Sequence, residues 1–250
     1  RTADDEGRAV YIADASTGEL LWSAGKSGST VVSEMDYSIP GRVVILDVKD
    51  DGFTDRLYVA DVGGQIFRFD IDNDNGSALA SSVSGGRIAD IAQNASTTDA
   101  RRFFYPPDVA LVAPKGEQAY IAVVASTGNR AHPLDIDVRE RIYMFKDYDV
   151  FKKPASYTTL TESDLYDATL NLVAGDGDEA ANDAAAASLE NSDGWYIKLD
   201  DGTNTDTWVG EKGLAEPLII SGNVIVTTFT PSVAGVSTSK CSPASGLGKV

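Results

Sequence analysis

Short apolar runs separated by Gly-containing turns recur along this chain, which is the pattern of β-hairpins. Residues 10–22 read VYIADASTGELLW, and residues 57–69 read LYVADVGGQIFRF. The two segments share a tyrosine, an Ala-Asp pair, a turn glycine and a closing aromatic residue: Tyr11 with Tyr58, Ala13-Asp14 with Ala60-Asp61, Gly18 with Gly64, and Trp22 with Phe69. We therefore predict two related hairpins, each with a tight turn between two strands.

Three later segments resemble these hairpins. They are residues 119–129 (AYIAVVASTGN), 195–202 (WYIKLDDG) and 217–231 (PLIISGNVIVTTFTP), the last with residues 221–223 as its turn. A hairpin that recurs at intervals of roughly 40–50 residues and ends in an aromatic residue is typical of a β-propeller. The whole chain, residues 1–250, is predicted to be one all-β domain, a modified propeller with quinoprotein-like blades. A β-sandwich is the competing architecture.

One stretch, residues 161–191, interrupts the strand pattern. Thr161 and Asp164 have the spacing of a helix capping box, with Asp in place of the usual Glu. The alanines at 184–187 favour a helix. We expect one or two short helices inserted between blades, either as a solvated decoration or as a lid for a partner.

Composition indicates a folded and strongly acidic protein. The chain has 250 residues, of which 42% are apolar and 24% charged, and its formal net charge is −17. So many carboxylates repel phosphate backbones and anionic lipid, which disfavours binding to nucleic acid or to a membrane surface. They favour cations, and calcium first among them. No apolar run is long enough to span a membrane.

An acidic loop at residues 47–55 (DVKDDGFTD) carries the clearest chemical signal. Asp47, Asp51 and Asp55 stand at positions one, five and nine, with Gly52 at position six and the Phe53 carbonyl at position seven. This is the spacing of the first part of an EF-hand loop, which delivers oxygen ligands to calcium. The spacing predicts a compact calcium site that leads into the next strand.

Two departures separate this loop from an EF-hand. Position three is Lys49 instead of an oxygen donor, and position twelve is Tyr58 instead of a bidentate glutamate. The alternative is an acidic turn whose carboxylates face water. A second acidic stretch, residues 70–76, also alternates oxygen-bearing side chains, and an ordinary loop is the favoured interpretation there.

Other chemistry has little support in the sequence. His132 is the only histidine and lies in a turn-rich stretch, so a zinc site or a catalytic relay would rest on it alone. The glycosidase carboxylate pair cannot be picked out among so many acids, and a glycine-rich phosphate loop is absent. We expect no enzyme. Cys241 is the only cysteine, so no internal disulfide framework is expected, and the thiol is either buried or bonded to a partner.

Several motifs, in one order along the chain, resemble the C-terminal domain of the PilC/PilY family of type IV pilus tip adhesins and biogenesis factors. They are residues 47–70 (DVKDDGFTDRLYVADVGGQIFRFD), 102–108 (RFFYPPD), 128–133 (GNRAHP), 194–196 (GWY), 210–218 (GEKGLAEPL) and 227–231 (TTFTP). Each motif is weak alone, and together they cover almost the whole chain.

The resemblance implies a modified propeller at the outward end of a large secreted protein, of which this chain is a piece. Family members lie at the pilus tip or on the outer membrane, where they promote pilus assembly, oppose retraction and mediate surface attachment and twitching motility. Calcium regulates these effects in the family. Asp47, Asp51 and Asp55 match the ligands, together with the Phe53 carbonyl, whereas Lys49 departs from the usual oxygen donor.

The sequence therefore predicts an extracellular, calcium-binding propeller domain of a pilus-associated adhesin. Its expected partners are minor pilins or the pilus tip complex, and a receptor on a host or abiotic surface. Two alternatives remain open at this stage. One is a propeller like those of quinone-dependent (PQQ) dehydrogenases, and the other is a structural scaffold without a metal.

Overall fold

Strands dominate the computed structural model, which describes residues 2–75, 78–92, 96–170, 172–173, 178–200, 207–231 and 246–249. The expectation of a mostly β protein with few helices is confirmed. Cys241 lies outside the described residues. No helix in the described part of the chain has the length and apolar character that a membrane crossing requires.

The first sheet contains the first predicted hairpin. Its strands β1 (Val10–Ala13), β2 (Leu20–Gly25) and β3 (Thr30–Val31) lie in that order, with β1 antiparallel to β2 and β3 parallel to β2. The Asp14 carboxylate accepts the backbone N–H groups of Ser16 and Thr17, which closes the turn. Gly18 has φ +75°, a conformation in which a side chain would be strained.

The second sheet is an antiparallel meander that contains the second predicted hairpin. It consists of β4 (Val44–Leu46), β5 (Arg56–Ala60), β6 (Gln65–Ile71) and β7 (Val83–Asp90). Asp61 in the β5–β6 turn accepts the N–H groups of Gly63 and Gln65, as Asp14 does for its own turn. Two short helices, η1 (Asn73–Asn75) and α1 (Leu79–Ser82), lie between β6 and β7.

The third sheet has five strands in the order β11-β12-β10-β9-β8. They are β8 (Asp108–Val112), β9 (Tyr120–Ser126), β10 (Arg141–Asp147), β11 (Tyr166–Asp167) and β12 (Gly194–Lys198). The segments at 119–129 and 195–202 each supply one strand to this sheet. From the sequence, both segments resemble the two hairpins. In the structure, neither segment folds back on itself, and each pairs with β10.

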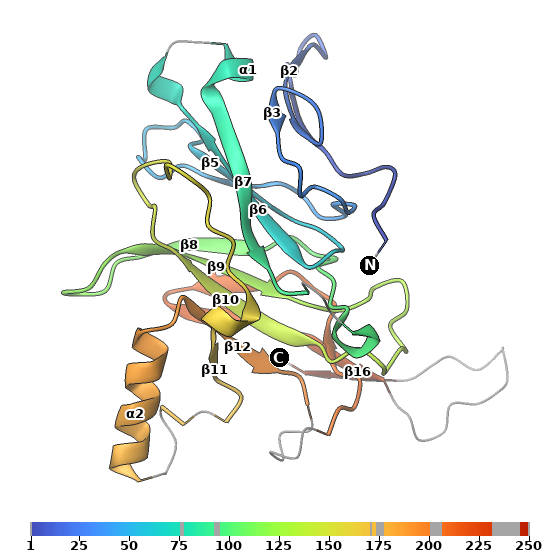
Figure 1. Cartoon of the computed structure of the whole chain (residues 1–250), viewed down its shortest axis with the longest axis vertical. Helices are drawn as coiled ribbons and strands as arrows, with labels where there is room; N and C mark the ends of the chain where they lie inside the picture. The colour runs from blue at the N-terminus through green and yellow to red at the C-terminus, as the bar shows by residue number, and fades with distance from the viewer. Residues whose placement is uncertain are drawn as a thin grey trace, which may run out of the picture.

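The predicted insertion contains one turn of 3-10 helix and one α-helix within the described residues. The turn η3 (Glu162–Asp164) begins at Thr161, whose backbone N–H donates to the Asp164 carboxylate at 2.7 Å, as the capping spacing predicts. The helix α2 (Glu179–Glu190) covers the alanine run. It projects at the end of the molecule (Figure 1).

A further 3-10 turn, η2 (Thr97–Asp99), precedes β8.

The last described segments form two small sheets. One contains β13 (Lys212–Gly213), β16 (Thr228–Pro231) and β17 (Gly246–Lys249), and the other is the hairpin β14 (Leu218–Ile220) with β15 (Asn223–Ile225). The turn of this predicted hairpin contains two residues, Ser221 and Gly222, with φ +50° and +79°. Positive φ at both turn positions matches the twist of the flanking strands.

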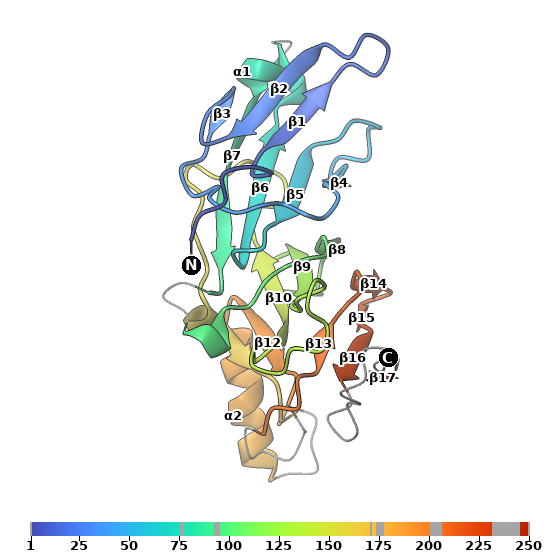
Figure 2. The same ribbon diagram turned by 90° about the vertical axis from the view of Figure 1, so that its right-hand side faces the viewer.

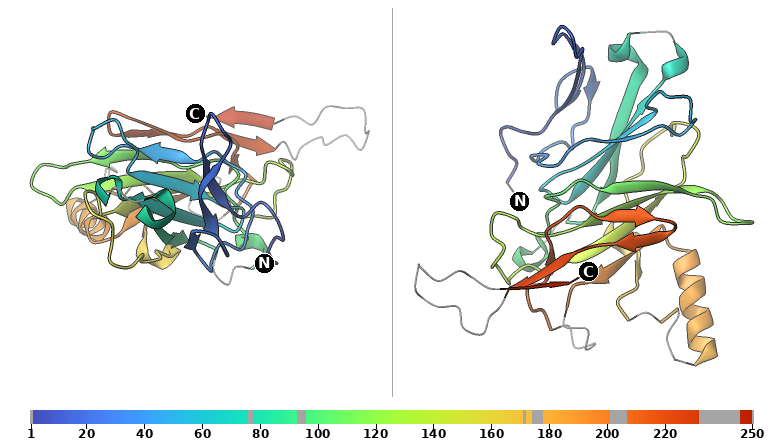
Figure 3. Two further views of the ribbon diagram at one scale, coloured as in Figure 1. Left: turned by 90° about the horizontal axis from the view of Figure 1, so that it is seen from above. Right: turned by 180° about the vertical axis from the view of Figure 1, so that it is seen from behind.

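The sheets follow one another along the long axis of the molecule. The β1–β3 sheet lies at one end, and α2, β16 and β17 lie toward the other (Figure 2). Two further views show the same succession (Figure 3). The sheets of the described residues do not close into a ring, so the propeller stays a prediction.

Two apolar cores join neighbouring sheets. The first packs β1 and β2 against the β5–β6 hairpin, and the rings of Trp22 and Phe69 meet edge to face with centroids 5.3 Å apart. These are the two closing aromatic residues of the repeated hairpins. The second core lies between the four-stranded and five-stranded sheets and includes Tyr58, Phe103 and Phe145. The first hairpin thus buries its closing aromatic residue against that of the second, as neighbouring units do in repeat architectures.

A buried polar junction connects the five-stranded sheet to β13 and β16. Glu140 is 2% exposed, and its Oε2 atom has no hydrogen-bond partner among the described residues. Burial raises the pKa of Glu140 to about 7, while the Thr127 hydroxyl and Lys212 act in the opposite direction. Burial likewise lowers the pKa of Lys212. The folded protein therefore favours a neutral carboxyl at Glu140.

This junction predicts a pH dependence of stability. Glu140 titrates near its ordinary value in the unfolded chain and near pH 7 in the folded protein, so the folded state binds the extra proton in between. Its contribution is complete below about pH 4.5 and is lost as the pH rises to about 7. Relative to Glu140→Gln, the free energy of unfolding of the wild type should fall by about 3 kcal/mol over that range.

Urea denaturation at several pH values measures the difference. Glu19→Gln, on an exposed turn, is the control and should follow the wild type at every pH. A constant difference between the wild type and Glu140→Gln would contradict the prediction.

Candidate functional site

The acidic loop at 47–55 connects β4 to β5. Asp55 stands directly before β5 and is 1% exposed. Its Oδ2 atom accepts the backbone N–H groups of Val48 and Lys49, at 3.0 and 3.1 Å. Its own N–H donates to the Leu46 carbonyl at 3.0 Å, which continues the pairing of β4 with β5. Asp55 therefore fixes the two ends of the loop to one another.

The other two aspartates stabilise the turn itself. The Asp47 carboxylate accepts the N–H groups of Asp51 (3.3 Å) and Gly52 (2.8 Å). Asp51 in turn accepts the N–H of Phe53 at 2.9 Å. Asp50 has φ +56° and Gly52 has φ +87°. The turn therefore contains two residues in the left-handed region, with one residue between them. Aspartate tolerates that conformation better than most residues, and glycine adopts it freely.

Lys49 connects the loop to the second acidic stretch. Its Nζ atom lies 2.7 Å from Asp74 Oδ2 and 3.8 Å from Asp55 Oδ1. The hydrogen bond to Asp74 raises the pKa of Lys49. Asn73 adds a bond from its side-chain amide to the Thr54 carbonyl at 3.1 Å. The two acidic stretches, separate in sequence, thus lie side by side, with the Lys49 ammonium between their carboxylates.

The fit of calcium to this loop can be judged from these contacts. Carboxylate and carbonyl oxygens are the ligands that calcium prefers. However, Asp47 and Asp51 point at loop N–H groups, and the ammonium of Lys49 lies beside Asp55. Among the described residues, no group of three His, Cys, Asp or Glu side chains is arranged to hold a metal ion. The donor set has suitable chemistry, but the predicted ligands do not converge in this conformation.

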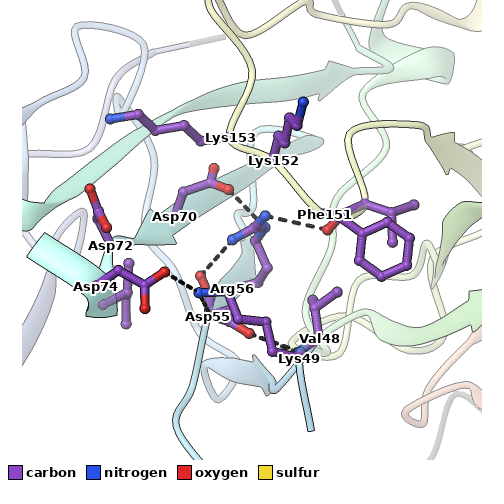
Figure 4. A pocket seen from close by; sticks show the side chains of 12 residues that line it. Val48, Lys49, Asp55, Arg56, Asp70, Asp72, Asp74, Phe151, Lys152 and Lys153 are labelled. Atoms are coloured by element: carbon purple, nitrogen blue, oxygen red, sulfur yellow. Dashed lines mark hydrogen bonds and ion pairs between the residues drawn. The ribbon is translucent and has the colours of Figure 1, made fainter. Parts of the chain in front are cut away.

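A cavity of about 290 Å³ opens beside the loop (Figure 4). Its walls come from the loop, from the end of β6 and from residues 150–153. Positive and negative side chains face one another across it, while Phe151 is 65% exposed at its edge. The charged lining residues are Lys49, Arg56, Lys152 and Lys153, with Asp55, Asp70, Asp72 and Asp74. This balance of charge favours neither an anion nor a cation at the cavity as a whole.

The floor of the cavity rests on a buried ion-pair network. Arg68 is 1% exposed and lies 2.7 Å from Asp70 and 2.6 Å from Asp147. Arg56 approaches Asp70 at 2.7 Å from the other side, although its Nε is not aligned for a hydrogen bond. The hydroxyl of Tyr58 donates to Asp147 at 2.8 Å. This network joins β5 and β6 to β10.

The structure thus gives the sequence-predicted residues different roles. Asp55 is buried in the strand pairing, Asp47 and Asp51 close the turn, and Phe53 is 65% exposed. Lys49 is the residue that reaches outside the loop. Arg56 and Asp70 are neighbours of this site that the sequence pattern did not predict. Charged residues at positions 56, 68 and 70 of two predicted strands were a signal, because strands bury such groups only when they are paired.

Four of the other family-like motifs, at 102–108, 128–133, 210–218 and 227–231, meet near the Glu140 junction. The N–H of Gly128 donates to the Arg102 carbonyl at 3.2 Å, and the N–H of Gly213 donates to the Thr127 carbonyl at 2.9 Å. A Cβ atom on Gly128 would lie 2.3 Å from the Gly213 carbonyl oxygen, so only glycine fits there. Thr228 donates to Glu211 at 2.5 Å. His132 is exposed in the adjoining loop.

Comparisons with known proteins identify the fold. No family model matches the chain. No curated protein matches its sequence. Among solved structures, the crystal structure of the C-terminal domain of PilY1 from Pseudomonas aeruginosa is similar, with a TM-score of 0.60 and 19% identity over 89% of this chain. The chain therefore has a PilY1-like fold, as its motifs predicted. It spans about half of the length of that structure, 50%.

The contacts of Asp55 predict a large effect of removing its carboxylate. In Asp55→Ala, two N–H groups at the start of the loop lose their acceptor and the Lys49 ammonium loses a neighbour. The free energy of unfolding should fall by about 2–4 kcal/mol. Asp51→Ala, an exposed substitution in the same loop, should cost less than about 1 kcal/mol.

Urea denaturation of both variants without added metal measures these costs. Equal losses in the two variants would show that Asp55 has no special place in the strand pairing.

Proposed function

We propose that this chain is an extracellular domain of a type IV pilus-associated adhesin, which supports pilus assembly, counteracts retraction and mediates surface attachment and twitching motility. The observation that carries the proposal is the fold shared with the PilY1 C-terminal domain over 89% of the chain. The family-like motifs support it independently, because they occur in one order along the sequence and several of them meet in the fold.

The same proposal includes the architecture and the partners of the chain. The sheets of this chain would be quinoprotein-like blades of a modified propeller. The partners of the chain would be minor pilins or the pilus tip complex, and a host or abiotic surface receptor. The role is one of binding and assembly, without catalysis.

We further propose that calcium binds the 47–55 loop in competition with the Lys49 ammonium. Bound calcium would draw oxygen ligands together, which the Asp47, Asp51 and Asp55 side chains and the Phe53 carbonyl can provide. Lys49 lies close to Asp55, so calcium must displace the Lys49 ammonium from the Asp55 carboxylate when it binds. Such binding would stabilise the folded domain by mass action, by about 2.7 kcal/mol at a hundredfold excess over Kd.

The pilus association is tested in the bacterium that encodes the full protein. Pili sheared from the cells should carry the protein, as detected with an antibody against this chain. Deletion of the gene should reduce surface pili, attachment and twitching, and a copy of the gene should restore them. Absence from sheared pili, together with unchanged piliation and motility, would reject the proposal.

The calcium proposal is tested by removing the competing ammonium. Lys49→Asn supplies an oxygen donor and removes a positive charge, so calcium affinity should rise at least about tenfold. Titration calorimetry and the shift of Tm with added calcium measure the effect. Lys153→Asn removes the same charge from the neighbouring cavity wall and should change the affinity less.

Two outcomes count against calcium. One is an absence of heat and of a Tm shift in both the wild type and Lys49→Asn. The other is binding that survives Asp47→Ala combined with Asp51→Ala. Either result would leave the metal-free scaffold as the account of this loop, without bearing on pilus association.

A further inference from the structure

The five-stranded sheet has two different faces. The side chains of Ile121, Val123, Tyr143 and Phe145 point into the core shared with the four-stranded sheet. The alternate residues form the outer face: Tyr120, Ala122 and Val124 on β9, Met144 on β10 and Trp195 on β12. The β14–β15 hairpin covers part of this outer face through Ile219 and Val224. The remainder faces α2 and the turn before β9.

A cavity of about 640 Å³ lies between this outer face, α2 and the turn at 116–118. We call it the α2 cavity. Its sheet side is formed by Tyr120, Tyr148 and Trp195, and its rim by Glu117, Gln118 and Glu190. A second cavity of about 320 Å³ adjoins it, and Trp195 and Leu189 line both. The volume of the α2 cavity lies within the usual range for small-ligand sites, roughly 300–1,000 Å³.

The aromatic side chains of the α2 cavity are held in place by the sheet. Met144 is the cross-strand neighbour of both Val124 and Trp195, which fixes the indole beside β10. Tyr120 and Tyr148 contact edge to face, with ring centroids 5.9 Å apart. Tyr148 is 36% exposed. Tyr120 and Trp195 lie on strands, and Tyr148 directly follows β10. Rings held in this way offer apolar surface at little cost in conformational freedom.

The polar groups of the α2 cavity include both donors and acceptors. The Lys146 ammonium donates to the carbonyls of Leu189 and Ser192, at 3.2 and 2.9 Å, at the end of α2. It also lies 6.0 Å from the centre of the Tyr120 ring. Glu117, Gln118 and Glu190 are exposed at the rim. The Gln118 carboxamide can both donate to and accept from hydroxyl groups, and the two carboxylates can accept from them.

These features disfavour several classes of ligand. Glu117 and Glu190 repel an anion, in a protein whose net charge is already −17. An ammonium ligand on the Tyr120 ring would meet the Lys146 ammonium, which already lies 6.0 Å from the centre of that ring, and the two positive charges would repel one another. A wholly apolar ligand would pack on the aromatic side chains but would make no hydrogen bond with the carboxylates and the amide of the rim. What remains is a neutral molecule with an apolar face and a ring of hydroxyl groups.

We propose that the α2 cavity binds a neutral sugar residue. The C–H face of a pyranose ring would pack on the aromatic side chains, while its hydroxyl groups bond with the rim residues. This site is separate from the 47–55 loop and from the cavity beside it. Its existence does not depend on pilus association or on calcium.

The test uses the purified chain and four neutral disaccharides: lactose, maltose, mannobiose and chitobiose. Saturation-transfer NMR should detect contact with at least one of them. Tyr148→Ala should reduce the affinity for that sugar at least about fivefold, because it removes one ring of the platform. Glu117→Ala on the exposed turn should also weaken binding, and Tyr148→Phe should stay within about twofold of the wild type.

Tyr11→Ala is the matched control, since Tyr11 is a 66% exposed aromatic residue on β1, in another sheet. It should leave sugar binding unchanged, and thermal melting should show that each variant is folded. The proposal is overturned if no disaccharide receives saturation, or if tetramethylammonium binds and the sugars do not. It is also overturned if sugar binding survives both Tyr148→Ala and Glu117→Ala.

Discussion

The burial of Arg68 is the constraint on which the arrangement of the two largest sheets depends. Its side chain is buried, and an unpaired charge there would be very costly. Asp70 on the same strand and Asp147 at the end of β10 both contact it, and the carbonyl of Asp149 accepts a further bond at 2.8 Å. These contacts therefore tie β6 of the four-stranded sheet to β10 of the five-stranded sheet.

The same network determines the surroundings of the acidic loop. Asp70 contacts Arg68 and Arg56 at once, so the end of β6 and the start of β5 are held together beneath residues 47–55. The Tyr157 hydroxyl adds a bond to Asp70 at 2.7 Å. Asp70 is thereby occupied by arginines and a phenol, and it is not free to act as a cation ligand. Lys49 and Asp74 then lie over the network and link the loop to η1.

The α2 cavity follows from a different property of the same sheets. One face of the five-stranded sheet is buried in the core that it shares with the four-stranded sheet, and its other face also carries apolar side chains. The β14–β15 hairpin and α2 cover that face from two sides, but they do not meet. The α2 cavity is therefore a by-product of how the strands are paired, since the residues that line it come from segments far apart in the sequence.

The sequence by itself determined the hairpins, because alternation and turn chemistry act over a few residues. Asp14 and Asp61 close their turns through bonds that span four residues or fewer, and the capping pair at Thr161 and Asp164 is equally local. The acidic loop and its position before a strand could be read in the same way, as could the PilY1-like motifs.

Tertiary structure alone decided which charges are buried, which carboxylates face which cations, and where the cavities lie. Lys49 meets Asp74, and Arg68 meets Asp147, across long stretches of chain. The energy of such pairs depends on burial and on the distance between the charges. Both are set by sheet packing, which the order of residues along the chain does not reveal. Tertiary structure also decided that β9 and β12, from residues 119–129 and 195–202, both pair with β10. Strand pairing depends on which apolar faces the fold buries.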